Sequence, residues 1–429
     1  MQALPAYGRT PGIPAGPDES VVNTEQIGRV GVWVYIGWLT TSVIEGPLRG
    51  GLAAVGLANI IYLRDLALVL TVAVAFVLPV LRGTRHAPGL VLMGWLLALH
   101  LCIGLLMGGT LTLFDRLFGV KIFMPMLFTV AIFPAVDKHF RLFVQVMAVF
   151  FVISAAGVFL NDSLGEMPWE GLTYDTAFGQ VETTKKWWMD GGLRRLSGFA
   201  RASFDAAMIL GLGGAMLMAL ARAWWLRLLI AAIGCWAILL TTSKGMVLAY
   251  LVAALWLVPT NRSRGSLAAG RSIVILLLLI ACLVPTLFMI MSVPEFPVDI
   301  PPLLSSLWDR FSWMWPSAFA LLPDWFGAFT GAGLGGIGMP LGLIPVPNTA
   351  DSIFVYYYIS FGLLGILYLA FPVVAILGRK AQADPRSFVW AGLLVIAYGY
   401  GLSANMVEQS FFTSVFGLLY GKAFAVSRQ

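Results

Sequence analysis

The chain has 429 residues, of which 59% are hydrophobic and only 11% are charged, and its mean hydropathy is +0.87. Soluble domains carry about 25% charged residues, so this composition excludes a soluble globular protein. It predicts an all-α integral membrane protein with many crossings. The formal net charge of +6 does not require a nucleic-acid partner, because basic residues collect on one side of a bilayer.

The predicted elements begin after a tail. Residues 1–27 contain several Pro and Gly and lack the basic-then-apolar order of a signal peptide, so we expect a disordered cytoplasmic tail there. A polytopic transmembrane domain over 28–426 follows. A crossing helix needs about 20 mostly apolar residues, and about twelve segments are candidates in chain order: 28–45, 64–82, 88–108, 117–136, 142–160, 202–221, 224–241, 244–259, 272–292, 352–377, 387–405 and 409–426.

The distribution of basic residues predicts the orientation of these segments. By the positive-inside rule, the side with most Lys and Arg is cytoplasmic, and both termini fall on it. Two connections on the opposite side are long, about 161–201 and 293–351, and loops of this length are usually functional or disordered. Their aromatic residues favour ordered, functional loops. The basic residues assigned to the inner side are Arg9, Arg29, Arg82, Arg85, Lys138, Arg141, Arg222, Arg227, Arg262, Arg264, Arg271, Arg379, Lys380, Arg386, Lys422 and Arg428.

The second long connection contains a segment with helical periodicity at 303–322. Leu304, Trp308, Phe311 and Trp315 fall on one face of it. This pattern predicts an amphipathic helix lying on the outer leaflet. Packing of the same face onto the bundle is an equal explanation of the aromatic residues.

Basic residues on the outer side run against the positive-inside rule, so each calls for a reason. Arg194, Arg195 and Arg201 precede a span, and Lys244 occupies a short turn between two spans. Arginines there can snorkel to the headgroups, or Arg201 can pair with Asp205 four residues later. The alternative is that these cations bind a phosphate at headgroup depth.

Two acids stand close to predicted helix ends on the outer side. A glycine-rich run, Gly331 to Gly338, reads as a mobile loop that leads to Asp351 just before a span, and Glu408 lies in the last outer connection. Asp351 either complements a helix dipole or takes part in chemistry. No histidine is predicted on this side, so a general base must be Asp or Glu. The outer loops contain neither a metal-spaced acid cluster nor a nucleotide-binding motif, so we expect no metal and no cofactor.

The order of these features resembles the superfamily of O-antigen ligases and Wzy-type polysaccharide polymerases, over roughly residues 190–365. Ligases of this superfamily carry a histidine where this chain has Asp351, which favours a polymerase. Three short motifs carry the resemblance: Arg195-Leu-Ser-Gly198-Phe199, Thr241-Thr-Ser243-Lys244-Gly245, and Gly331 to Gly338 followed by Asp351 and by Gly362 to Gly365.

The resemblance implies a glycosyltransferase of the bacterial inner membrane, with both termini cytoplasmic. It would polymerise undecaprenyl-diphosphate-linked oligosaccharide repeat units on the periplasmic face, without a metal and with inversion. The lipid-linked glycan is donor and acceptor, and a chain-length regulator is a further partner. The predicted catalytic residues are Asp351 and Glu408, the diphosphate-binding residues are Arg195, Lys244, Arg201, Arg194 and Arg310, and the sugar-stacking residues are Tyr356, Tyr357, Trp313 and Trp315, with Trp187 and Trp188 as further candidates.

Three other functions stay open at this point. An O-antigen ligase and a glycan polymerase of the SEDS type would use the same kind of lipid-diphosphate donor. A flippase for lipid-linked oligosaccharide is the alternative from another class. The chain shows no internal repeat, which gives no support to a transporter built from inverted repeats.

Overall fold

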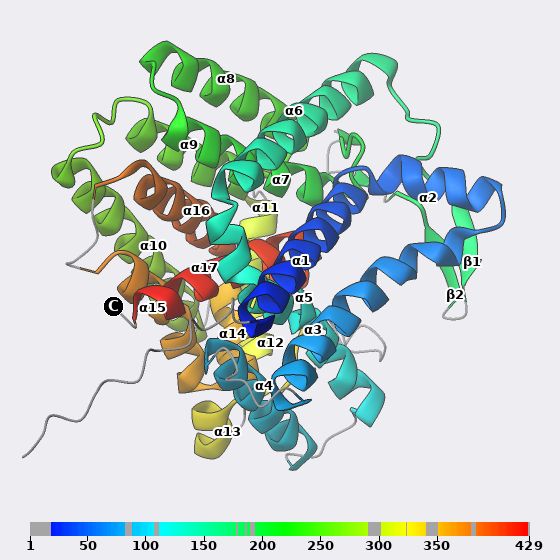
Figure 1. The fold of residues 1–429 in the computed structure, drawn as a ribbon, viewed down its shortest axis with the longest axis vertical. Helices are drawn as coiled ribbons and strands as arrows, with labels where there is room; N and C mark the ends of the chain where they lie inside the picture. Colours follow the sequence, from blue (N-terminus) through cyan, green and yellow to red (C-terminus); the bar gives the residue numbers. More distant parts are fainter. Residues whose placement is uncertain are drawn as a thin grey trace, which may run out of the picture.

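A computed structural model describes residues 19–81, 88–106, 111–176, 179–184, 187–188, 194–290, 302–322, 324–339, 351–378 and 383–427. Most of them lie in helices (Figure 1). The elements are α1 (Glu19–Val43), α2 (Glu45–Ala54), η1 (Ala58–Tyr62), α3 (Leu63–Leu81), α4 (Pro88–Leu106), α5 (Leu113–Lys138), α6 (Phe140–Leu164), β1 (Thr173–Thr176), β2 (Gly179–Glu182), β3 (Trp187–Trp188), β4 (Arg194–Arg195), α7 (Ser203–Leu220), α8 (Trp224–Leu240), α9 (Lys244–Leu257), α10 (Arg264–Ile290), α11 (Pro302–Asp309), η2 (Arg310–Met314), α12 (Trp315–Phe319), α13 (Trp325–Thr330), α14 (Ile353–Phe361), α15 (Leu363–Ile376), α16 (Pro385–Gly401) and α17 (Ser410–Val426).

The helices confirm the predicted class, a helical multi-pass membrane protein. Within the described ranges, six are long and apolar enough to cross a membrane: η1 with α3, then α4, α5, α6, α7 and most of α10. Shorter apolar helices are α8, α9, α15 and α17. Each predicted span overlaps helix in the part of it that the structure describes, although the finer prediction of twelve crossings stays a prediction.

One predicted span, 352–377, is two helices. Gly362 separates α14 from α15 with φ +61°, a left-handed conformation that glycine adopts without cost. A side chain at this position would also collide with the Phe329 carbonyl group at the end of α13. The break therefore follows from a close backbone approach that apolar composition does not reveal.

Two other predicted boundaries need correction. α1 begins at Glu19, so residues 19–27 are helical and not part of a disordered tail, while 1–18 lie outside the described residues. The predicted amphipathic helix at 303–322 is divided into α11, η2 and α12. Its Phe311 ring stacks on Phe288 of α10 at 3.8 Å between ring centroids, and Trp315 is 2% exposed. This segment packs on the bundle, as the alternative explanation of its aromatic residues required.

The core surrounds α16 and α17. Every residue of α16 from Phe388 to Gly401 is buried, and the helix packs against α7, α9 and α10. α17 lies along α5, where Gly417 sits directly on the backbone of Met126. Small residues let helices approach closely in a membrane, where burial of apolar surface alone gives little drive for association.

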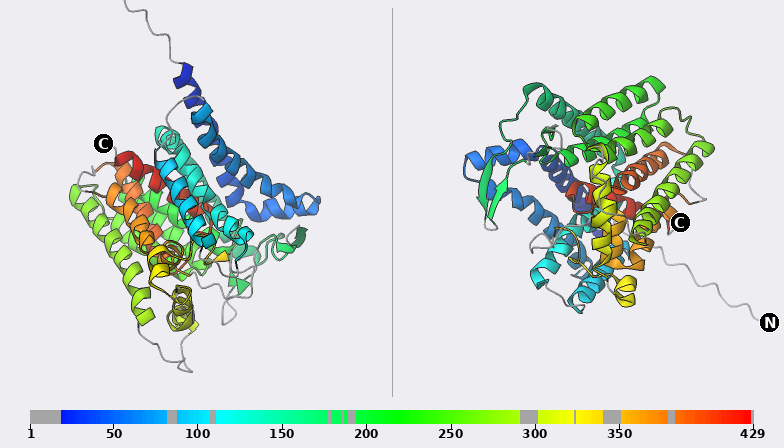
Figure 2. Two further views of the ribbon diagram at one scale, coloured as in Figure 1. Left: turned by 90° about the horizontal axis from the view of Figure 1, so that it is seen from below. Right: turned by 180° about the vertical axis from the view of Figure 1, so that it is seen from behind.

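The long connections gather at one end of the bundle. In the left view of Figure 2, the described strands and α11 to α13 lie opposite the end that holds the start of α1 and the C-terminus. α7 and α9 start among these connections, at Ser203 and Lys244, and end at Leu220 and Leu257 on the other side. We call the first end the site end and the second the far end.

Candidate functional site

At the site end, Arg195 contacts the turn that precedes α9. Arg195 lies on β4, which pairs antiparallel with β3, and its Nε donates a hydrogen bond to Thr242 Oγ1 at 3.0 Å. Thr242 has φ +57°, a conformation that is uncommon for a β-branched residue and is found at strained functional sites. Lys244 begins α9 two residues later. The first two motifs of the sequence are therefore in contact.

Gly198 explains the spacing of the first motif. Its φ is +58°, and a Cβ atom there would lie 2.7 Å from the Val158 backbone nitrogen of α6. Its own N–H donates to Asn161 Oδ1 at 3.1 Å. The segment after Arg195 is thus held against α6 by backbone contacts that only glycine allows. These contacts fix the position of the neighbouring strand β4.

An ion pair links two distant parts of the second long connection. Arg310 Nη2 lies 3.0 Å from Asp351 Oδ2, although Arg310 is on η2 and Asp351 is two residues before α14. Loss of hydration raises the pKa of Asp351, and the positive charges of Arg310 and Arg195 act in the opposite direction. The Asp351 side chain is 44% exposed, so it stays accessible from outside the bundle.

Glu408 lies close enough to Asp351 for the two charges to interact. The Met339 backbone N–H donates to Glu408 Oε1, and Gly338, with φ +88°, leaves room for that carboxylate. Burial raises the pKa of Glu408 to about 7, and the negative charge of Asp351 contributes to the shift. A carboxylate with this pKa is suited to accept and release a proton near neutral pH.

The glycine-rich run before Asp351 is held in place where the structure describes it. Residues 331–338 are almost entirely buried. Arg116 Nη1 of α5 donates to the carbonyl groups of Ala332 and Leu334 at 2.9 and 3.1 Å, and Leu334 N–H donates to the His100 carbonyl at 3.2 Å. The expectation of a mobile loop is wrong for this part, and residues 340–350 lie outside the described ranges.

Replacing Gly335 by alanine tests this packing. Gly335 has φ +77°, and a Cβ atom would lie 2.7 Å from the Asp115 carbonyl oxygen. Left-handed backbone and overpacking together are expected to cost roughly 2–5 kcal/mol of stability. Gly51→Ala is the control, because nothing lies within 4 Å of that position on α2. Thermal unfolding in detergent should show a lower Tm for Gly335→Ala only, and equal Tm values would refute the packing argument.

Two of the predicted diphosphate-binding arginines are engaged elsewhere. Arg194 forms an ion pair with Glu170 and donates to the Gly165 carbonyl. Glu170 is nearly fully buried, so Arg194 is needed to neutralise it. Arg201 lies near Glu45, which also pairs with Arg49 and Arg64. The structure therefore brings together Arg195, Arg310, Asp351 and Glu408, whereas Arg194 pairs with Glu170 and Arg201 lies near the charge of Glu45.

Three of the predicted sugar-stacking residues are buried. Tyr356 and Tyr357 are each 1% exposed and Trp315 is 2% exposed. Their rings contact other side chains, such as Phe123 for both tyrosines and Phe311 for Trp315. We correct the prediction accordingly, since a buried ring offers no face to a sugar. Trp313 is 42% exposed and keeps that possibility; the Trp187 and Trp188 side chains lie outside the described residues.

Tyr400 is a site residue that the sequence reasoning missed. It lies on the last turn of α16, and its hydroxyl is close to the charged groups of Arg195, Asp205 and Asp351. Gly245 of the second motif is in contact with Ser403 and the Tyr400 ring. The polar residues between Ser403 and Gln409 were the available signal, but only Glu408 was singled out from them.

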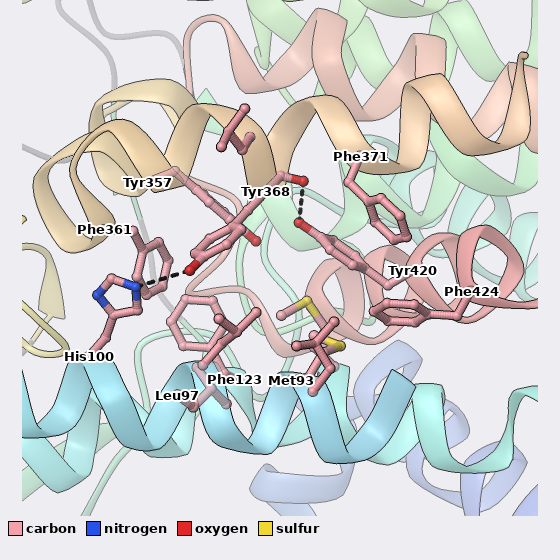
Figure 3. Close-up of a pocket in the computed structure, with 14 residues that line it drawn as sticks. Met93, Leu97, His100, Phe123, Tyr357, Phe361, Tyr368, Phe371, Tyr420 and Phe424 are labelled. Carbon is pink, nitrogen blue, oxygen red and sulfur yellow. Dashed lines mark hydrogen bonds between the residues drawn. The ribbon is translucent and has the colours of Figure 1, made fainter. Parts of the chain in front are cut away.

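An apolar groove of about 270 Å³ opens beside the site helices (Figure 3). α4, α5, α14, α15 and α17 line it with aromatic and aliphatic side chains, Tyr357 and Phe361 among them. Leu92 and Leu367 at its edge are 50% and 62% exposed. Its polar corner is His100, whose Nε2 lies 3.2 Å from the Tyr368 hydroxyl. The groove fits an apolar chain and little else.

Comparison of the sequence with protein-family models gave no match, and comparison with curated proteins gave none either. The resemblance to polysaccharide polymerases and ligases therefore rests on the three motifs alone. Among the described residues, no three His, Cys, Asp or Glu side chains gather closely enough to hold a metal ion. The metal-free reaction stays a prediction.

Proposed function

We propose that the protein is a polymerase that joins oligosaccharide repeat units carried on undecaprenyl diphosphate. The observation that carries the proposal is one cluster at the site end. Arg195, the Lys244 turn and Arg310 supply positive charge, and Asp351 and Glu408 supply carboxylates within electrostatic reach of one another. All five were candidates on sequence grounds, although they come from five separate segments of the chain.

The cations suit the leaving group of such a reaction. Undecaprenyl diphosphate gains negative charge as the bond between its terminal oxygen and the anomeric carbon breaks. Fixed positive charges lower the energy of that state because they need no reorganisation. Arg195 is oriented by Thr242, and Arg310 by its contacts with Ser306 and Asp351. We assign both to the diphosphate, together with Lys244.

The carboxylates suit the incoming hydroxyl group. Its oxygen attacks the anomeric carbon, the electron pair of the breaking bond leaves with the diphosphate, and the hydroxyl proton passes to a base. We assign the base to Glu408, because its pKa of about 7 matches neutral conditions. Asp351 is held by Arg310 and is assigned to binding the sugar. A single displacement of this kind inverts the anomeric carbon.

The groove in Figure 3 suits the isoprenoid part of the substrate. α14 begins two residues after Asp351 and carries Tyr357 and Phe361 in the groove wall. At about 1.5 Å per helical residue, the wall starts within about 10 Å of the carboxylate. Twelve crossings, with the site end periplasmic and both termini cytoplasmic in a bacterial inner membrane, complete the proposal.

The decisive experiment uses the purified protein in detergent with a defined undecaprenyl-diphosphate repeat unit. We expect a ladder of lipid-linked products that grows without added nucleotide. A single transfer to a different acceptor would indicate a ligase instead. In liposomes, movement of the intact lipid-linked unit across the bilayer without any ladder would refute the polymerase and favour the flippase.

A further inference from the structure

A second cluster of arginines lines a cavity at the far end of the bundle. The cavity measures about 470 Å³ and lies between the end of α7, the start of α8 and the connection after α9. Arg222, Arg227 and Arg262 line it together with Thr260. Because α7 has 18 residues, this cavity lies about 27 Å along the helix axis from the site end.

Arg227 explains how the cavity is built. It is 5% exposed and donates from Nε to the Ala221 carbonyl at 2.8 Å and from Nη1 to the Leu257 carbonyl at 3.2 Å. These carbonyl groups close α7 and α9, where helices leave acceptors unsatisfied and carry partial negative charge. Arg227 is therefore a fixed structural cation that joins the two helix ends.

The cavity also contains polar atoms without a hydrogen-bond partner, on Arg262 and Thr260. Arg262 has φ +55° and donates from Nη2 to the Ala219 and Ala221 carbonyls at 2.9 and 2.7 Å, but its buried Nε has no hydrogen-bond partner. Thr260 is 7% exposed, and its hydroxyl is also without one. Arg222 is exposed at the rim. Within the described part of the chain, no ion pair involves Arg222, Arg227 or Arg262.

The electrostatics of the cavity favour an anion. Burial lowers the pKa of Arg262, and the positive charges of Arg227 and Arg222 lower it further. A bound anion would relieve that repulsion. Arginine pairs well with phosphate oxygens because its guanidinium group presents parallel donors, and the Thr260 hydroxyl offers one more donor.

We propose that this cavity binds a phosphate group, with Arg222, Arg262 and Thr260 as its ligands. The adjoining Trp224 and Trp225 are 66% and 58% exposed, and exposed tryptophans mark the headgroup level of a membrane. The favoured source is therefore the headgroup of an anionic phospholipid, and free phosphate is the other source. The site is independent of the function proposed for the site end.

The test is lipid-dependent stabilisation of the purified protein in detergent. Tm is measured while phosphatidylglycerol, phosphatidylcholine or inorganic phosphate is added. We expect phosphatidylglycerol to raise Tm more than phosphatidylcholine does. In Arg222→Gln, the phosphatidylglycerol concentration that gives half of this shift should rise about tenfold or more. Arg264→Gln is the matched control, since Arg264 is exposed at the start of α10, two residues after Arg262, but does not line the cavity. Thr260→Val should weaken the response without any change in net charge.

The outcomes separate the alternatives. Stabilisation by inorganic phosphate that Arg222→Gln and Thr260→Val both weaken would support the site with free phosphate as its source. An equal loss in Arg222→Gln and Arg264→Gln, with none in Thr260→Val, would mean that only general surface charge matters. That result would overturn the proposal, and so would an equal response to both phospholipids together with no response to inorganic phosphate.

Discussion

Arg195→Ala is expected to reduce polymerisation by about 10²–10³-fold, the usual loss when one preorganised charge donor is removed from a transition state. Its folding should be nearly unchanged, because the hydrogen bond from Arg195 to Thr242 contributes only about 1 kcal/mol. Initial rates of ladder formation with the lipid-linked repeat unit, together with Tm in detergent, give both quantities for the same preparation.

The neighbouring arginine supplies the control for this prediction. Arg194→Ala leaves Glu170, nearly fully buried, without its ion-pair partner, which costs about 3–5 kcal/mol. Arg194→Ala should therefore lower Tm strongly, while the fraction that stays folded turns over at a rate near wild type. If Arg195→Ala kept full activity, or if its loss followed Tm as in Arg194→Ala, the assignment of Arg195 to the diphosphate would fail.

The contrast between these two arginines shows what the sequence could predict. Hydropathy and charge bias place both on the outer side, since each rule acts locally along the chain. The ion pair of Arg194 depends on Glu170, which is 24 residues away, and on how the intervening hairpin folds back. The motif around Arg195 favoured it as the better candidate, and that assignment stays a prediction. The ion pair of Arg194 is a tertiary contact without a local signal.

The glycine-rich run and the aromatic residues illustrate the same limit. Four glycines with positive φ, Gly331, Gly333, Gly335 and Gly338, predict a loop with unusual backbone, and the structure has one. Whether such a loop moves depends on its neighbours, and here Arg116 of α5 holds it. The sequence alone does not show whether Tyr356 and Trp315 belong to the core or to a binding surface. Only the packing of α14 and α12 shows that both are buried.

The sequence also does not indicate that Asp351 pairs with Arg310 or that Glu408 accepts a hydrogen bond from Met339. Both carboxylates were predicted because each lies close to the end of a predicted helix on the outer side. The order in which the two are preferred as the general base is reversed, however. The sequence favoured Asp351 as base. Burial raises the pKa of both carboxyl groups, but the charges of Arg310 and Arg195 counteract the rise at Asp351, whereas the charge of Asp351 adds to the rise at Glu408. This difference in environment, and not the residue type, separates a binding carboxylate from a proton acceptor.

Glu408→Gln is therefore expected to change how both activity and stability depend on pH. The wild-type rate should rise as Glu408 loses its proton and level off above a pH of about 7, the pKa of this group. Without the carboxylate the rate should fall about 10²–10⁴-fold and lose this dependence. Glu408→Asp should recover part of the rate and keep a rising limb, which a purely structural role would not produce.

Stability should move in the opposite sense. The folded-state pKa of Glu408 is raised from 4.5 to about 7, so the ionised carboxylate destabilises the folded state above pH 7, by roughly 3 kcal/mol at 1.36 kcal/mol per pKa unit. Below pH 4.5 the group is protonated in both states and this effect vanishes. Gln keeps an acceptor for the Met339 N–H, so Glu408→Gln should have the higher Tm at pH 8 and the wild-type Tm at pH 4. A variant that is less stable than wild type at pH 8, yet fully active, would show that Glu408 only supports the loop at Met339.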